Sequence, residues 1–364
     1  MSGTKIKFAN NQEVEFVNNL RARVKNYFEE NGISKFGNFN MVIKTIFMFS
    51  LFFAPYLLMM TGVVTNPWLI VAGFVLMGFG MAGIGLSVMH DANHKSYSKH
   101  QWVNKVLSYS LNLVGGFYPN WQQQHNVMHH GYTNIEGYDE DIDPGNILRF
   151  SPNSELKKHH KYQHIYAWFL YGLMTLTWSI DKDIKQLYRY FKDGIQISKD
   201  KSKGVLVTEL VISKILFYGY ALVIPLIFLP VPWWSVLLLY FLMHFIAGFS
   251  LAVIFQTAHV MPENDYPMPD QAGNIENNWA IHQLHTTSNY APKNKVLSWF
   301  VGSLNFQVEH HLFPTICHVH YPKIASIVKS TAEEYNIPYH VQPSFGAAIK
   351  EHYKMMRRLG RETA

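Results

Sequence analysis

The sequence predicts an all-α membrane protein, with four transmembrane helices in two hairpins and a cytoplasmic helical cap that holds a histidine-rich dinuclear metal site. Three observations lead to this fold class. First, 48% of the 364 residues are hydrophobic and only 15% are charged, which is an apolar composition for a soluble protein. Second, four apolar stretches reach the roughly 20 residues that a helix needs to cross a bilayer. Third, clustered histidines lie at or just beyond the ends of apolar stretches.

The N-terminal segment, residues 1–40, is polar, and we expect it to be cytoplasmic and amphipathic. Five apolar residues recur there at helical spacing, namely Phe16, Val17, Leu20, Val24 and Phe28. The pair Asn31-Gly32 matches the end of such a helix. We predict that the apolar stripe packs on the membrane or on the domain that contains the histidines. Because hydrophobicity begins only at Met41, we expect no secretory signal and interpret the first span as an uncleaved anchor.

The candidate spans form two hairpins inside a membrane domain that we predict to cover residues 41–322. They occupy residues 41–64, 68–88, 205–229 and 233–258, and Glu209 and Lys214 interrupt the third span. The connectors 65–67 and 230–232 contain no Lys or Arg, whereas the segments outside the spans contain nearly all 31 basic residues. By the positive-inside rule, both termini and the middle loop are therefore expected to be cytoplasmic. Residues 323–364 are predicted to form a cytoplasmic helical tail.

A fifth apolar run, residues 165–180, is shorter and rich in Trp and Tyr. As a full span, it would place the third histidine cluster on the opposite membrane face from the first two. We therefore interpret this run as an interfacial helix.

Charge and cysteine content restrict the partners and the compartment. The single cysteine, Cys317, excludes an internal disulfide framework and agrees with a reducing cytoplasmic location. We interpret it as a structural, unreactive thiol. The net charge of +6 favours anionic lipid head groups at a cytoplasmic leaflet. No stretch interleaves aromatic and basic residues as a nucleic-acid-binding surface would, so we expect no nucleic-acid partner.

Seven histidines fall into three clusters that we predict to bind metal. The clusters are His90 and His94, then His125, His129 and His130, and finally His310 and His311. Imidazole suits iron, zinc and copper without adding negative charge. One zinc ion takes three or four protein ligands, so seven histidines favour two metal ions. Residues four apart on a helix differ by about 40° in direction and can converge on one ion, whereas adjacent residues point about 100° apart and could serve two.

Other polar residues near these clusters are further candidates. His259 follows the fourth span and is included as a metal ligand, because an ionisable group at a membrane boundary is a functional candidate. Gln307 could bind metal, hydrogen-bond a bound water or support a ligand. For His282 and His285, metal binding and other roles both remain open. We interpret His244, inside the fourth span, as an interhelical hydrogen-bonding residue.

Acidic residues near the clusters could orient the imidazoles, because a metal-bound imidazole donates its other ring proton to a carboxylate or carbonyl. Asp91, Glu309 and the acidic run 139–143 are candidates for this orienting role, and Gln307 is a candidate for support of a ligand. We interpret the acidic run 139–143 first as a solvated loop, and second as a source of charge that offsets a cationic centre.

Three motifs occur in order around the two hairpins: His90-Asp-Ala-Asn-His94, His125-Asn-Val-Met-His129-His130 and Gln307-Val-Glu-His310-His311. They resemble the histidine boxes of the integral-membrane fatty acid desaturases, and the resemblance covers roughly residues 41–322. It implies a non-haem di-iron centre that uses dioxygen to remove two hydrogens from an acyl chain and leave a cis double bond. The glutamine that opens the third box is similar to the front-end and linoleoyl-CoA desaturase-like bacterial members, whose new double bond lies on the carboxyl side of an existing one.

The resemblance also implies partners. Many front-end members contain a fused b-type cytochrome domain with a His-Pro-Gly-Gly motif, which this sequence lacks, so we expect electrons from a separate ferredoxin or b-type cytochrome. The substrate would be a fatty acyl group on coenzyme A, a carrier protein or a membrane lipid. An apolar channel between the spans would hold it. Small residues at 78–85 and at Gly248 could line that channel or pack the helices together.

Three other functions are compatible with parts of the pattern. Hydroxylases and ketolases share related histidine boxes. A membrane zinc hydrolase would need fewer ligands and a His-Glu-x-x-His motif, which this sequence lacks. A non-catalytic metal-binding lipid receptor or transporter is the alternative from a different class, and transport would favour polar groups at the midplane of broken helices.

Overall fold

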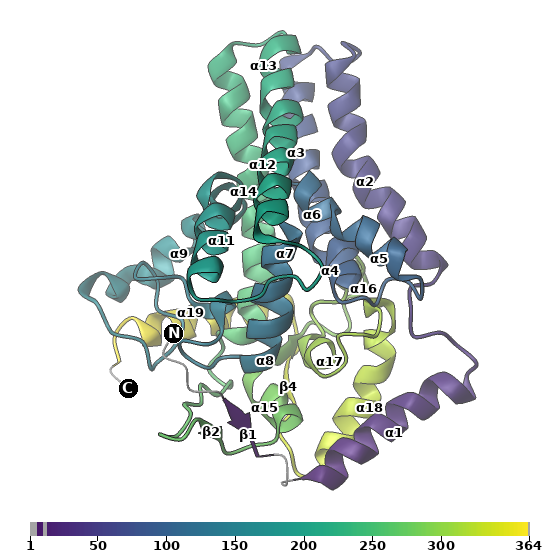
Figure 1. The fold of residues 1–364 in the computed structure, drawn as a ribbon, viewed down its shortest axis with the longest axis vertical. Helices are drawn as coiled ribbons and strands as arrows, with labels where there is room; N and C mark the ends of the chain where they lie inside the picture. Colours follow the sequence, from purple (N-terminus) through teal and green to yellow (C-terminus); the bar gives the residue numbers. More distant parts are fainter. Residues whose placement is uncertain (1–5, 10–12, 363–364) are drawn as a thin grey trace. The chain divides into compact units, whose positions relative to one another are not determined.

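The computed structural model describes residues 6–9 and 13–362, and this part of the chain is mainly helical (Figure 1). Its contacts divide it into two compact units. Unit 1 comprises residues 1–38, 124–167 and 254–364, and unit 2 comprises residues 39–123 and 168–253. Each unit is assembled from segments that lie far apart in the sequence.

Unit 2 contains the helical hairpins. Among the described residues, four continuous helices are long and apolar enough to cross a membrane, namely Phe39–Met60, Pro67–Asn93, Lys203–Phe228 and Trp233–His259. The first and last are α2 and α14. The second consists of α3 (Pro67–Gly83), the π-helix η1 (Ile84–Met89) and α4 (His90–Asn93), and the third of α12 (Lys203–Tyr218), the π-helix η6 (Gly219–Val223) and α13 (Ile224–Phe228). The predicted all-α membrane fold is confirmed.

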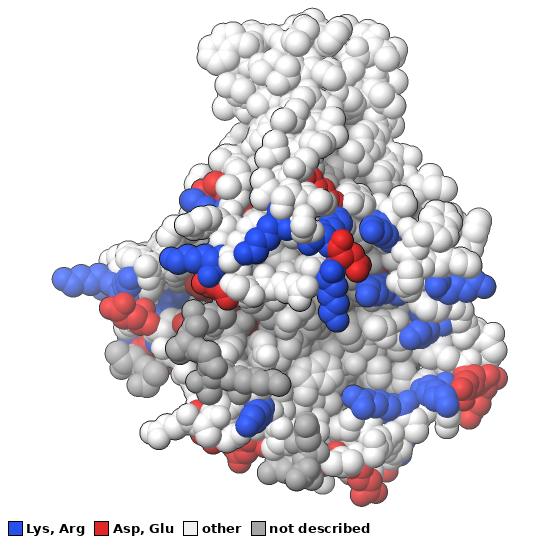
Figure 2. Space-filling view, in the orientation of Figure 1, with Lys and Arg blue, Asp and Glu red and all other residues white. Residues whose placement is uncertain are grey.

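Local sequence explains the tight turn of the first hairpin. The Asn66 side chain accepts hydrogen bonds from the backbone N–H groups of Trp68 and Leu69, and Pro67 occupies the first helical position of α3. On the face shown in Figure 2, the turn ends of both hairpins display no Lys, Arg, Asp or Glu. An uncharged helix end of this kind suits passage through hydrocarbon.

Small residues pack the helices of unit 2 together. A Cβ atom placed on Gly80 would lie 2.6 Å from the backbone nitrogen of Phe52 in α2, and one placed on Gly248 would lie 2.7 Å from the carbonyl oxygen of Gly172. Real Cβ atoms do not approach so closely, so these glycines permit backbone contact between helices. For Gly80 and Gly248, the helix-packing interpretation is therefore correct.

Polar residues inside the hairpin helices have partners within unit 2. The Lys214 ammonium lies 2.6 Å from an Asp183 carboxylate oxygen and also donates to two backbone carbonyls. Glu209 pairs with Lys201 at 2.6 Å. His244 Nδ1 lies 3.1 Å from the Thr175 hydroxyl, which confirms the predicted interhelical hydrogen bond. Charged groups in apolar helices are expected to be paired in this way.

The segments between the hairpins are short helices. In unit 2 they are α5 (Gln101–Ser108), α6 (Ser110–Leu113), α7 (Tyr118–Trp121), α10 (Met174–Thr177), the π-helix η5 (Trp178–Lys182) and α11 (Asp183–Lys192). The run 165–180 falls on α9 (Gln163–Gly172), α10 and η5 rather than on one continuous helix. Its interfacial position remains a prediction.

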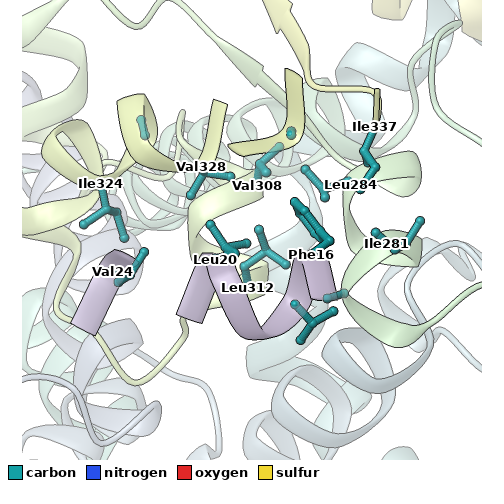
Figure 3. Close-up of a cluster of buried hydrophobic side chains, with 14 of the residues drawn as sticks. Phe16, Leu20, Val24, Ile281, Leu284, Val308, Leu312, Ile324, Val328 and Ile337 are labelled. Atoms are coloured by element: carbon teal, nitrogen blue, oxygen red, sulfur yellow. The ribbon is translucent and has the colours of Figure 1, made fainter. Parts of the chain in front are cut away.

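Unit 1 has its core between α1 and the C-terminal helices. Helix α1 (Val14–Glu30) packs against α15 (Trp279–Thr286), α17 (Gln307–Leu312) and α18 (Tyr321–Glu334). Figure 3 shows Phe16, Leu20 and Val24 pointing into this cluster. The apolar stripe therefore packs on the unit that contains most of the histidine motifs, and burying a side chain such as Phe16 contributes about 1.5–3 kcal/mol. Gly32, with φ +59°, follows the C-cap residue Asn31, as the sequence predicted.

Short elements complete unit 1. Strand β1 (Lys7–Phe8) pairs in parallel with β2 (Asn274–Ile275), and β3 (Ser288–Tyr290) pairs in parallel with β4 (His340–Gln342). The remaining helices are the π-helix η2 (Gln122–His129), which begins in unit 2, α8 (His130–Tyr132), η3 (Glu140–Ile142), η4 (Lys158–Tyr162), α16 (Lys295–Phe300), η7 (His318–His320) and α19 (Phe345–Leu359).

The buried Arg149 guanidinium donates to the carbonyl oxygens of Ser154, Leu359 and Glu362, and so holds the end of α19 in place. Cys317 is a buried thiol.

Candidate metal centre

The second histidine motif lies on the π-helix η2, not on the α-helix that the spacing argument assumed. π-Helical turns are rare, and those that occur lie frequently at functional sites. The His125 and His129 rings are nevertheless stacked, with centroids 5.1 Å apart and planes at 23°. The ring of His130, the first residue of α8, makes an angle of 75° with the His129 ring. Adjacent histidines thus face different directions.

Two acidic residues orient these rings. His129 Nδ1 lies 3.0 Å from each carboxylate oxygen of Asp139, and His125 Nδ1 lies 2.8 Å from Asp141 Oδ2. The Asp139 carboxylate is fully buried, and it also accepts from the backbone N–H groups of Asn134 and Asp141, each at 2.9 Å. The first interpretation of the acidic run, a solvated loop, is therefore wrong for Asp139 and Asp141. A solvated loop and an orienting loop have the same acidic composition, and only the fold distinguishes them.

The charge of Asp139 acts on the imidazole beside it. Burial lowers the pKa of His129, but the charge and hydrogen bond of Asp139, together with the charge of Asp141, raise it by more, and the net shift is upward. A carboxylate that accepts the Nδ1 proton leaves Nε2 as the atom that faces away from the acid. The Asp139 hydrogen bond therefore determines which nitrogen of His129 is available as a ligand.

The third motif, on α17, meets the second within unit 1. His129 Nε2 lies 3.2 Å from His311 Nε2, and His130 Nε2 lies 3.0 Å from His310 Nε2. Among the residues of unit 1, two groups of three imidazoles form, one from His129, His259 and His311 and the other from His130, His310 and His311. Within each group, the ligand atoms lie within 4.8 Å of one another. The adjacent residues His129 and His130 thus belong to different groups, and His311 belongs to both.

His259, the last residue of α14, provides a test of whether a metal ion fits. Its side chain is fully buried, and neither ring nitrogen has a hydrogen-bond partner among residues 6–9 and 13–362. An unmade hydrogen bond on a buried polar group costs about 1–3 kcal/mol. Its backbone is held by Asn134 and Asn264, whose side-chain amides donate to the His259 carbonyl oxygen at 3.1 and 3.0 Å. A buried imidazole with open nitrogens beside two other imidazoles fits a metal ion.

One supporting residue was missed at the sequence level. Gln283 Oε1 lies 2.7 Å from His311 Nδ1 and 2.9 Å from the Thr133 hydroxyl. Gln283 therefore orients the His311 ring through a hydrogen bond to Nδ1, as Asp139 does for His129. Gln283 lies between His282 and His285, the two candidate metal ligands in this segment. The only sequence feature that pointed to Gln283 was its position beside these two histidines, which also lie on α15.

His282 and His285 have other partners in the described structure. His282 Nε2 donates to the Thr133 carbonyl oxygen at 2.8 Å, and burial lowers its pKa to about 4. His285 Nδ1 lies 2.9 Å from Asp265, and its side chain is partly exposed. Neither belongs to the two groups of three imidazoles.

The two polar candidates that precede the third histidine pair differ in their contacts. The buried Glu309 carboxylate accepts from Asn289 and from the Tyr339 hydroxyl, each at 2.8 Å, and neither partner is an imidazole. Burial raises the pKa of Glu309 to about 7, against the effect of these two hydrogen bonds. Gln307 is buried as well, and its Oε1 has no hydrogen-bond partner within the described ranges. Gln307 thus retains an open acceptor, whereas Glu309 connects α17 with β3.

The first histidine motif lies in unit 2. His90 begins α4 and His94 follows its end, and their ring centroids are 4.7 Å apart. Trp121 makes edge contacts with both rings at centroid distances of 5.7 and 5.8 Å. Asp91 is buried, and its Oδ1 lies 4.0 Å from His90 Nδ1, which is beyond hydrogen-bonding distance. His90 and His94 thus form a close pair, as their spacing predicted.

Known proteins are similar to this chain over nearly its whole length. A family model described as fatty acid desaturase matches residues 66–343. An sn-1 linoleoyl-lipid 6-desaturase from Arthrospira platensis is 33% identical, over 99% of this chain and 96% of that protein. The enzyme of the same name from a Synechocystis strain is 32% identical over 99% of each chain. An acyl-lipid (8-3)-desaturase from Physcomitrium patens is 34% identical, over 98% of this chain and 74% of that protein. The chain belongs to the fatty acid desaturase family and is a membrane oxidoreductase.

Proposed function

We propose that the chain uses a non-haem di-iron centre and dioxygen to introduce a cis double bond into a membrane acyl chain. The main support is the arrangement of two imidazole groups in unit 1 that share His311. His129 and His259 complete one group, and His130 and His310 complete the other. The sequence motifs add His90, His94 and His125 to the proposed ligands, and a ligand atom of His125 also lies within 4.8 Å of those of His129 and Asp141.

When bound, the two ions would activate dioxygen, the oxidant for unactivated C–H bonds. The side chains of the protein hold the ions and orient the ligands. Neutral imidazoles hold the ions without cancelling their charge, in contrast to the carboxylate-rich sites of soluble di-iron bundles. Asp139 and Asp141 accept hydrogen bonds from Nδ1 of His129 and of His125, respectively. The Nε2 atoms therefore remain available as metal ligands. The six proposed ligands in unit 1 are all buried, which excludes bulk water from the centre, and they are His125, His129, His130, His259, His310 and His311.

We further propose a lipid-linked substrate and front-end regiochemistry. The relatives from Arthrospira and Synechocystis are named as 6-desaturases of a linoleoyl group on a lipid, and the alignment covers nearly the whole of each. Gln307, which opens the third motif, is the residue typical of front-end members. Its open Oε1 could bind an ion or a metal-bound water.

The electron donor and the membrane orientation complete the proposal. Electrons would come from a separate ferredoxin or b-type cytochrome. Both termini and the metal centre would lie on the cytoplasmic side, because the hairpin connectors lack basic residues.

The test combines metal content with product analysis. The chain is expressed in cells, and all fatty acids are examined by gas chromatography and mass spectrometry, with every new double bond located. The purified protein is assayed for iron. A double variant, His129→Ala with His130→Ala, is expected to lose both iron and the new alkene. His100→Ala serves as the control, because His100 is exposed and lies outside the motifs.

Each product has a separate meaning. A new double bond on the carboxyl side of an existing one, lost in the double variant, supports every part of the proposal. A methyl-side double bond would refute the regiochemistry and leave the desaturase reaction intact. A hydroxylated product would replace desaturation by hydroxylation. Full iron content in the double variant would refute the assignment of the ligands.

A further inference from the structure

Unit 2 contains a lateral groove of about 730 Å³ between α6 and the third membrane-spanning helix. This volume lies in the range typical of small-ligand sites. The lining of the groove runs along the helix from Gly204 to Tyr220, which corresponds to ~24 Å at 1.5 Å per residue. The groove therefore extends along much of the roughly 30 Å hydrocarbon core of a bilayer. All its lining residues belong to unit 2.

The wall of the groove is apolar and open toward lipid. Val205, Ile212 and Leu216 line it, and between 51% and 65% of each residue is exposed. Exposed aliphatic side chains on a membrane-spanning helix contact acyl chains. The opposite side of the helix is occupied, since Leu206 and Leu210 pack with Leu187 in a buried cluster. The groove is thus the lipid-facing side of a helix whose other side is already covered.

One end of the groove is polar. The Lys201 ammonium donates to Glu209 at 2.6 Å, to the Tyr118 hydroxyl at 2.8 Å and to the Tyr109 hydroxyl at 3.3 Å. An ammonium has three donors, so these three contacts use all of them. Ser202 caps the N-terminus of α12, which places Lys201 just before the membrane span begins. Tyrosine and lysine at such a position are typical of a membrane interface.

Two residues that line the groove each have a buried polar atom without a hydrogen-bond partner in the described part of the chain. Glu209 Oε1 has no hydrogen-bond partner among the described residues, and the same is true of Asn112 Nδ2. The orientation of the Asn112 amide is determined, because its Oδ1 accepts from the Tyr118 backbone N–H at 3.0 Å. Asn112 is only 7% exposed. The site therefore offers one acceptor and one donor that the protein does not satisfy, and unsatisfied buried groups are rare in folded proteins.

We propose that this groove binds one membrane glycerolipid whose head group is electrically neutral overall and donates hydrogen bonds. An acyl chain would lie along α12, and the head group would lie at Lys201 and Glu209. A head-group N–H or O–H would donate to Glu209 Oε1, and a lipid ester or phosphate oxygen would accept from Asn112 Nδ2. Ammonium-bearing and hydroxyl-bearing head groups share this chemistry.

The charge of the site distinguishes between lipids. Lys201 and Glu209 cancel, so a head group with a net negative charge gains no attraction. Coenzyme A, with several phosphates, is disfavoured for the same reason. Phosphatidylcholine is neutral but has no donor for Glu209. This lipid site goes beyond the proposed reaction, and lipid binding to it does not depend on the metal centre.

The test is competition between lipids, measured by native mass spectrometry of the purified full-length protein. The protein is exchanged into equal amounts of phosphatidylethanolamine, phosphatidylcholine, phosphatidylglycerol and a monoglycosyl diacylglycerol. We expect phosphatidylethanolamine, the glycosyl lipid or both to be retained about tenfold more than phosphatidylcholine, the effect of one hydrogen bond to a charged group. The relative retention of the first two identifies which donor the site prefers. Equal retention of all four lipids, or preference for phosphatidylglycerol, would overturn the proposal.

Two pairs of proteins localise the binding. Ile212→Trp fills the groove and is expected to abolish retention, whereas Ile215→Trp places the same ring on an exposed position that does not line it. Equal retention in these two variants would show that the lipid binds elsewhere. Asn112→Asp keeps the acceptor for the Tyr118 N–H and removes the donor, so it should reduce retention relative to the wild type. Melting temperatures verify folding, and if Ile212→Trp does not fold, unchanged retention in Asn112→Asp would itself refute the site.

Discussion

Replacing Asp139 by asparagine tests how the metal centre is oriented. The Asp139 carboxylate accepts from His129 Nδ1 and from the backbone N–H groups of Asn134 and Asp141. Asparagine has nearly the same shape, but one of its two terminal groups is an NH₂ donor. At least one of these three donors would then face another donor in a fully buried position.

The magnitude follows from this geometry. Leaving a buried donor unsatisfied costs about 1–3 kcal/mol. If the NH₂ group faces His129, the imidazole loses the acceptor that orients it, and mutations of such acceptors typically weaken metal affinity by about 10–100-fold. We therefore expect Asp139→Asn to bind iron 10–100-fold more weakly, about 1.4–2.7 kcal/mol by the usual conversion.

The assay is iron binding by the purified protein in competition with a chelator, combined with a melting curve of the metal-free protein. Asp143→Asn is the matched control, since Asp143 belongs to the same acidic run but is exposed. We expect the control to bind iron as the wild type does. If Asp139→Asn retained wild-type iron affinity, or if the two variants lost affinity equally, the orienting role of Asp139 would be refuted.

Three further predictions concern stability. Gly248→Ala should destabilise the protein by about 1–3 kcal/mol, because the new Cβ would overlap the Gly172 carbonyl, while Gly219→Ala, with open space around it, should change the melting temperature little. His352 is buried, and its pKa is lowered to about 4 from an ordinary value near 6.5. Its neutral form therefore contributes stability that is fully present above pH 6.5 and is lost as the pH falls to 4. The loss is roughly 3 kcal/mol, and melting temperatures measured across that window should decline less steeply in His352→Gln. Arg149→Leu should destabilise the end of α19 by roughly 3 kcal/mol, because it leaves carbonyls unpaired, and faster hydrogen exchange at residues 355–362 would show it. Unchanged exchange there would contradict this role.

Hydropathy predicted the membrane-spanning helices well, since a run of about 20 apolar residues has few alternatives to a helix in lipid. The polar interior was harder to predict. Neither η1 nor η2 could be identified as π-helical, because the change from α to π hydrogen bonding leaves no pattern in residue type. Spacing on an α-helix predicted that neighbouring histidines would face different directions. The rings of His129 and His130 do so, but His129 ends the π-helix η2 and His130 begins α8.

The supporting residues show the limit of composition. Asp139 and a solvated aspartate look alike in a sequence, and only burial distinguishes them. Gln283 was missed because a neutral amide carries no signal of its own beside two histidines. Its role depends on the contact with His311 and Thr133, which lie 28 and 150 residues away in the sequence. Long-range hydrogen bonds of this kind are determined by the fold as a whole.

The packing of α1 against α18 has a consequence for biosynthesis. Translation delivers Phe16 and Leu20 first, but their partners Ile324 and Val328 come about three hundred residues later. Between these events all four membrane-spanning helices must leave the ribosome. The apolar face of α1 therefore remains exposed through most of synthesis, and exposed hydrophobic surface favours aggregation. Such distant contacts also slow folding. A chaperone or the membrane surface must cover the apolar face of α1 until α18 has been synthesised. Truncation before α18 would leave α1 without its packing partners.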